Sequence, residues 1–163
     1  MCEPTTSPAS GFTLIELIVV IILMAILAAT AAPRFFDQNA FEGPAFAQEL
    51  ASAARYAQKL AVANGCPVRL VVTANSYALK RPNTFCDTTF ATPADAAHPA
   101  GLTFPVNAPN GVAITGQTFP FTVQFNPRGI PTDTSNVALA TVNLTVSGRT
   151  VVITAGSGYV EVQ

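Results

Sequence analysis

The sequence predicts an α+β protein in which one long N-terminal helix packs on a mainly antiparallel β-sheet. Two patterns carry this prediction. A long apolar block and a second stretch with helical spacing occupy residues 12–65. From residue 68 onward, apolar and polar residues alternate in short runs that are typical of strands. The chain shows no internal repeat and no second globular domain, so its 163 residues predict one domain behind a helix.

The composition argues against several classes of function. Half of the residues are hydrophobic, 10% are charged, and the formal net charge is -1. This balance offers no basic surplus for binding nucleic acid. The chain has one histidine and shows no paired carboxylates, metal cluster or nucleophile motif. The sequence therefore predicts neither an enzyme nor a protein with a metal or another cofactor.

The apolar block has the length of a membrane-spanning helix. Residues 12–32 read FTLIELIVVIILMAILAATAA, interrupted only by Thr13, Glu16 and Thr30. A helix of this length rises about 31 Å, enough to cross the hydrocarbon core of a bilayer. Because the block is apolar on every face, it does not have the pattern of an amphipathic surface helix. It is expected to lie in a membrane or in an equally dry environment.

Two other interpretations fit the block less well. A secretory signal peptide has a basic region before a short apolar core, whereas no Lys or Arg precedes residue 12. A plain membrane anchor explains the length but not Glu16, because a carboxylate near the membrane centre costs about 2.5–3.5 kcal/mol. Such a residue usually has a partner.

The start of the block resembles the processing site of type IV prepilins and type II secretion pseudopilins. The resemblance is carried by Gly11-Phe12-Thr13-Leu14-Ile15-Glu16-Leu17, and Pro33 matches a proline that the family often has near the end of the membrane segment. It implies that residues 1–11 are a leader peptide, that a prepilin peptidase cuts after Gly11, and that Phe12 is then N-methylated.

Charge pairing explains why Glu16 is useful in such a chain. Cleavage creates an amine at Phe12 that is cationic at neutral pH. Phe12 and Glu16 are four residues apart and lie on one helix face. Pairing of this amine with the Glu16 of a neighbouring subunit, or with its own, offsets the desolvation of both charges and fixes the axial register. Glu16 is therefore expected to control assembly and not folding.

The leader departs from the family pattern in its charge. Prepilin leaders usually carry Lys or Arg, whereas residues 1–11 contain none and include Glu3. The first basic residue, Arg34, follows the apolar block, against the positive-inside tendency. This departure bears on the position at which the leader begins more than on the resemblance to the family.

Residues 12–33 are expected to form the transmembrane or filament-core half of the helix, and residues 34–65 its amphipathic half. Pro33 is expected to kink the helix, Gly43-Pro44 to interrupt it again, and Asn64-Gly65 to end it. Steps of four and three residues place one apolar stripe on one face. This stripe consists of Phe46, Leu50, Ala53, Ala57 and Leu60.

Residues 66–163 are expected to form a globular β domain. Alternating patterns predict strands at residues 68–73, 77–80, 121–125, 138–146, 150–154 and 159–162. Residues 82–111 are rich in Pro, Thr, Ala and Asn and predict a long loop with one short strand at 102–106.

Short segments of this body resemble minor pilins and pseudopilins of the GspH, FimT and MshC type. They are residues 53–59, 65–68, 125–129 and 147–149. The resemblance implies a minor subunit of a type IV pilus, with a mannose-sensitive haemagglutinin (MSHA) type pilus as the preferred system. A GspH-like minor pseudopilin of type II secretion and a FimT-like DNA-uptake pilin are the alternatives. DNA binding is less favoured, because Arg149 stands alone late in the chain and backbone binding needs several cations together.

The cysteines predict a disulfide between Cys66 and Cys86. If Cys2 leaves with the leader, the remaining two form an even set, and an even set outside the cytoplasm favours a bond. A loop of this length gives such a bond about 3 kcal/mol in the chain-entropy model. The alternative is a metal site with His98, expected to be an exposed loop residue, but the ligand spacing is not convincing.

The family resemblance also implies partners and a location. The expected partners are a prepilin peptidase, other pilins or pseudopilins in a helical filament, an inner-membrane assembly platform and a separate assembly ATPase. The chain is expected in the bacterial inner membrane as a single-pass protein with a periplasmic globular domain, and then in a pilus or pseudopilus filament. The sequence does not separate these two systems, and it assigns no ligand to the loop at 82–111.

Overall fold

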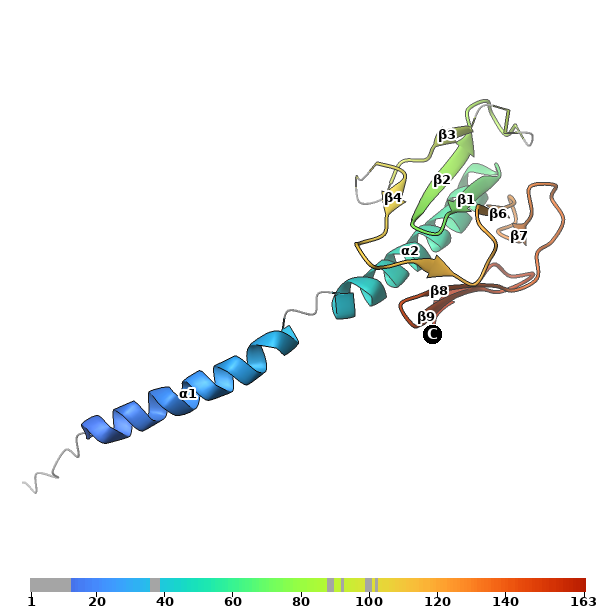
Figure 1. The fold of residues 1–163 in the computed structure, drawn as a ribbon. Helices are drawn as coiled ribbons and strands as arrows, with labels where there is room; N and C mark the ends of the chain where they lie inside the picture. The colour runs from blue at the N-terminus through green and yellow to red at the C-terminus, as the bar shows by residue number, and fades with distance from the viewer. Residues whose placement is uncertain (1–12, 36–38, 88–89, 92, 99–100, 102) are drawn as a thin grey trace, which may run out of the picture. The chain divides into compact units, whose positions relative to one another are not determined.

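The computed structural model describes residues 13–35, 39–87, 90–91, 93–98, 101 and 103–163. The chain divides into two compact units, Met1–Gln38 and Asn39–Gln163. Figure 1 shows helix α1 in the first unit, and helix α2 with the strands in the second. The leader predicted at residues 1–11, with its cleavage site at Gly11, and the predicted methylation site Phe12 lie outside the described residues.

Helix α1 spans Leu14–Phe35 and therefore continues two residues past Pro33. The kink expected at Pro33 stays a prediction, as does the transmembrane role of residues 12–33. In the part of the chain that the structure describes, no helix combines the length and the apolar character needed to cross a membrane.

Helix α2 spans Asn39–Asn64 and passes through Gly43-Pro44, so the interruption expected there is wrong. Tertiary packing explains the difference. A Cβ on Gly43 would lie only 2.4 Å from the Cβ of Ser147, so the glycine lets this part of the helix approach the turn between two strands closely. The helix ends at Asn64 as predicted, and Gly65 follows with a φ of 64°.

The apolar stripe of α2 forms one side of the protein core. Of its five predicted members, four are at most 4% exposed and Leu60 is partly buried. Four further alanines of the helix are also buried, namely Ala47, Ala51, Ala54 and Ala61. Small side chains at these positions let the helix lie close to the strands, and the compact unit that holds the sheets therefore includes α2.

The α+β class is confirmed, but the strands form two antiparallel sheets where one was expected. The first has the order β3-β2-β1-β6-β7, with β4 also paired to β2. Its strands are β1 (Val68–Val72), β2 (Ser76–Pro82), β3 (Pro93–Asp95), β4 (Val106–Asn107), β6 (Phe121–Phe125) and β7 (Pro131–Thr132). The second has the order β10-β9-β8-β5. Its strands are β5 (Ile114–Thr115), β8 (Val142–Val146), β9 (Arg149–Ile153) and β10 (Val160–Val162).

Helix α2 packs against strands of both sheets (Figure 1). Side chains of the helix and of both sheets form one hydrophobic core. Alternation along the strands supplies the core side chains: Leu70, Leu79, Val123, Leu144 and Ile153 are each fully buried. One helix thus serves as the common support of two small sheets.

The predicted strands differ from the observed ones mainly in their ends. The strand expected at 138–146 begins only at Val142, because Ala138 makes an isolated bridge to Thr132 and does not continue into a ladder. The described residues of the segment at 82–111 form two short strands, β3 and β4, and β4 at Val106–Asn107 replaces the strand expected at 102–106.

Candidate functional site

The surface of α1 is the first candidate site. All twelve large apolar side chains from Leu14 to Leu27 are exposed, with exposed fractions between 38% and 76%. Covering such a side chain is worth about 1.5–3 kcal/mol. A bare apolar helix of this kind is therefore a strong docking surface for lipid or for other apolar helices.

The first turn of α1 is closed by Thr13. The Thr13 hydroxyl oxygen accepts a hydrogen bond from the Glu16 amide at 3.3 Å, and the Thr13 carbonyl accepts one from the Leu17 amide at 3.2 Å. Thr13 is thus the N-cap, and Glu16 occupies the third helical position, which gives the Thr-x-x-Glu spacing of a capping box. The sequence analysis missed this cap, although the spacing of the two residues signals it.

The capping position changes the interpretation of Glu16. Its carboxylate lies in the first turn of α1, where the helix dipole favours a negative charge. Glu16 therefore has a local role in starting the helix besides the assembly role expected from sequence. Its proposed partner, the amine of Phe12, lies outside the described residues, so the assembly role stays a prediction.

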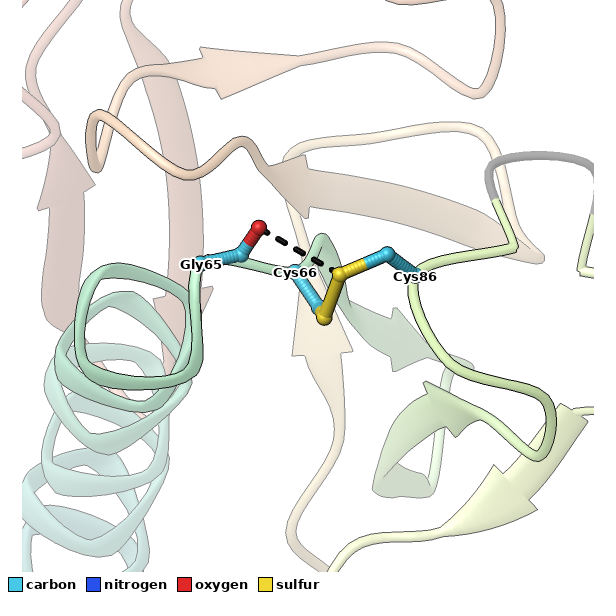
Figure 2. The surroundings of a disulfide bond; sticks show 3 residues. All are labelled: Gly65, Cys66 and Cys86. Carbon is cyan, nitrogen blue, oxygen red and sulfur yellow. Dashed lines mark hydrogen bonds between the residues drawn. A yellow bond between two sulfur atoms is a disulfide. The ribbon is translucent and has the colours of Figure 1, made fainter.

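Cys66 and Cys86 form the predicted disulfide, with Cα atoms 4.7 Å apart. The bond joins the segment after α2 to the loop after β2 (Figure 2). The Cys86 sulfur lies 3.5 Å from the Gly65 carbonyl oxygen. Since a disulfide sulfur carries no proton, this is a close contact and not a true hydrogen bond. Both sulfurs are engaged, so the alternative metal site with His98 is not formed.

His98 is half-buried, not fully exposed as expected. Its ring lies 5.1 Å from that of Phe104, centroid to centroid. Phe104 in turn meets Tyr77 edge-on at 6.2 Å. The histidine is therefore part of a ring cluster along the segment between β3 and β4.

Arg69 is the centre of a polar cluster that the sequence analysis did not find. Its Nε donates to the side-chain oxygen of Gln124 at 2.8 Å, and its guanidinium lies 3.7 Å from the centroid of the Phe90 ring. Burial lowers the pKa of Arg69, and the charge of Asp87 opposes this shift. Gln124, fully buried, also donates to the side-chain oxygen of Asn136 at 2.6 Å. The cluster holds the loop after the disulfide against the first sheet.

Tyr77 and Glu49 connect α2 to strand β2. The Tyr77 hydroxyl donates to Glu49 Oε1 at 3.0 Å. Burial, together with the nearby Glu49 carboxylate, raises the pKa of Tyr77 above its ordinary value. Because an ionised carboxylate can accept a hydrogen bond but cannot donate one, Tyr77 is the donor in this pair.

Gln58 connects α2 to a turn of each sheet. Its Nε2 donates to the Gly129 carbonyl, in the turn between β6 and β7, and to the Ser157 carbonyl, in the turn before β10, each at 2.9 Å.

Two further contacts support this arrangement. Arg55 Nε donates to the Val160 carbonyl at 3.0 Å. A Cβ on Gly158 would lie 2.2 Å from the Gly129 oxygen, so only glycine fits there. These contacts give a structural role to residues of the segments at 53–59 and 125–129.

Comparison with known protein families is consistent with this geometry. The family model described as Type II transport protein GspH matches residues 47–158. The model described as Prokaryotic N-terminal methylation motif matches residues 7–32. No curated protein and no solved structure matches the chain.

An apolar N-terminal helix with a methylation motif, followed by a helix on antiparallel sheets, defines a type IV pilin-like protein, the class that includes the pseudopilins. The GspH model covers more than half of the chain, from within α2 to the end of the turn before β10. The chain belongs to the GspH family. The resemblance drawn from the residues around Gly11 and Glu16 is thereby confirmed at the level of the superfamily.

Proposed function

We propose that this chain is a minor, structural subunit of a helical filament and that it has no enzymatic activity. The observation that carries the proposal is the uncovered apolar surface of α1, which needs a lipid or protein environment. Before assembly, α1 lies in the inner membrane with the globular unit in the periplasm. After assembly, the same surface packs against the α1 helices of neighbouring subunits.

Processing precedes assembly in this proposal. A prepilin peptidase removes residues 1–11, and Phe12 becomes the methylated N-terminus. The new amine pairs with Glu16 of an adjacent subunit and sets its axial position. An inner-membrane platform and a separate ATPase drive the insertion of subunits.

The type of filament is the finer part of the proposal. Membership of the GspH family favours a minor pseudopilin of type II secretion. A minor pilin of an MSHA-type pilus is the second candidate, supported by the resemblance of residues 53–59 and 147–149 to minor pilins. The FimT-like role in DNA uptake has the least support, because the residues around Arg149 carry no second cation. Deleting the gene separates the three: loss of exported proteins, of surface pili or of DNA uptake.

Replacing Glu16 tests the assembly role and separates it from capping. A capping box accepts Gln in place of Glu, whereas an ion pair needs the charge. We expect Glu16→Gln to keep α1 intact, to be cleaved after Gly11, and to be absent from sheared filaments or cross-linked filament complexes. Glu16→Ala removes both functions and serves for comparison.

Mass spectrometry of the mature N-terminus and quantification of the subunit in filaments are the measurements. Glu16→Asp, which keeps the charge, is the matched control and is expected to retain part of the incorporation. Incorporation of Glu16→Gln at the wild-type level would overturn the charge-pairing mechanism. Retention of residues 1–11 in cells with an active prepilin peptidase would overturn the proposed function itself.

A further inference from the structure

A pocket of about 390 Å³ lies beside the disulfide. One wall comes from the end of α2 and the start of β1, with Asn64 and Pro67, and the other from the end of β2 and the following loop, with Arg81 and Phe85. The bond between Cys66 and Cys86 joins the two walls (Figure 2). The pocket is thus held in shape by a covalent link, which limits the entropy lost when a ligand binds.

The apolar part of this pocket has a buried floor and an exposed rim. Pro67, Val68 and Pro82 are buried. Phe85 is 89% exposed, the largest exposed fraction among the large apolar residues of the part of the chain described. An aromatic ring at the edge of a concave site offers a flat apolar face for stacking.

The polar part of the pocket is cationic and free to bind a ligand. Among the described residues that line it, Arg81 is the only charged one. The neighbouring Lys80 is paired with Asp95 at 2.5 Å, whereas the guanidinium of Arg81 has no hydrogen bond or ion pair within the described residues. The lining also includes Asn64, Asn83 and Thr84, whose side chains likewise make no hydrogen bond in the described part of the chain.

These groups fit one class of ligand. A guanidinium without an acidic neighbour in the lining binds a carboxylate. Amide and hydroxyl side chains both donate and accept hydrogen bonds, as sugar hydroxyls do. A peptide anchor instead needs a deep pocket from which water is fully excluded, and the polar rim of Asn64, Asn83 and Thr84 is exposed. We infer that this pocket binds an acidic saccharide, with the sugar ring on Phe85 and its carboxylate on Arg81.

This binding site is independent of filament assembly. All of its residues belong to the globular unit Asn39–Gln163, whereas the assembly surface belongs to α1 in the other unit. The inference therefore does not depend on the type of filament proposed above. It also gives a role to the loop that starts at Pro82, for which the sequence suggested no ligand.

Saturation-transfer NMR on the full chain in detergent micelles tests the inference, with glucuronic acid and a glucuronate-containing disaccharide as probes. Glucose is the neutral probe, and a short peptide with acidic side chains represents the other ligand class. We expect transfer to the ring protons of both acidic sugars, and at least about tenfold weaker binding of glucose, because the charge-assisted bond to Arg81 is missing.

Two variants and two matched controls identify the site. Arg81→Gln and Phe85→Ala should each weaken binding of the disaccharide by about fivefold or more. Arg128→Gln and Phe41→Ala replace an exposed residue of the same type outside the pocket and should leave binding unchanged. Thermal unfolding of each variant should match the wild type, since the replaced side chains are exposed.

Three outcomes would overturn the inference. The first is the absence of transfer to either acidic sugar at millimolar concentration. The second is an equal loss of binding in the pocket variants and in their controls. The third is binding of the acidic peptide, but not of the sugars, that depends on Arg81 and Phe85, because the pocket would then recognise a protein partner.

Discussion

Replacing Gly158 by alanine tests whether the turn before β10 is held against the turn after β6. Gly158 has a φ of 66°, and an added Cβ would lie 2.2 Å from the Gly129 carbonyl oxygen and 2.6 Å from Gln58 Nε2. Alanine costs about 1–2 kcal/mol in this backbone conformation. Displacing Gln58 breaks its bonds to the two carbonyls, which adds about 1–3 kcal/mol. We expect Gly158→Ala to lower the free energy of unfolding by about 3 kcal/mol in total.

Gly156→Ala is the matched control for this change. Gly156 lies in the same turn with a φ of 73°, but its added Cβ meets no atom within 4 Å. It should therefore cost only the conformational part, about 1–2 kcal/mol. Urea unfolding of the full chain in detergent, followed by circular dichroism, measures both variants. If Gly158→Ala is no more destabilising than Gly156→Ala, the close approach of the two turns is refuted.

Three further changes test other contacts of the globular unit. Gln58→Ala should lower the free energy of unfolding by about 2 kcal/mol by leaving two carbonyls without their donor, whereas its exposed neighbour Lys59→Ala should change it by less than about 0.5 kcal/mol in the same urea titration. The double change Cys66→Ser and Cys86→Ser should cost about 3 kcal/mol. Dithiothreitol should lower the urea midpoint of the wild type and leave that of the variant unchanged. A wild-type midpoint that does not change with dithiothreitol would exclude the bond. Stability should fall as the pH rises above about 10, because the unfolded Tyr77 ionises there while the folded one, with its raised pKa, keeps its proton. Tyr77→Phe should flatten this part of the pH profile, and an unchanged slope would show that Tyr77 does not cause it.

Local patterns in the sequence predicted the helices and the main strands. The stripe from Phe46 to Ala57 and the end of α2 at Asn64 depend on neighbours within a few residues, and the structure has both. The cysteine pair could be inferred because only two cysteines follow the apolar block. The methylation motif is equally local, since all of its residues lie within one short segment.

Contacts between distant segments could not be predicted in this way. Gln58 bonds to residues 71 and 99 positions later, and no periodicity within α2 indicates such partners. Arg69 bonds to Gln124, 55 positions later. Alternation predicts that a strand exists but not which strand it joins, so one sheet was expected where two are found. The local sequence predicts an interruption at Gly43-Pro44, because it does not indicate the close approach of Ser147.

The double attachment of Gln58 has a mechanical consequence. A pulling force along the axis of α2 acts on both sheets at once. Gln58 bonds to the turns at Gly129 and Ser157, and Arg55 bonds to strand β10 at Val160. The load is then expected to be shared between the two sheets. We therefore expect a pull on the N-terminal end of this unit to act on both sheets together and not on a single strand pair.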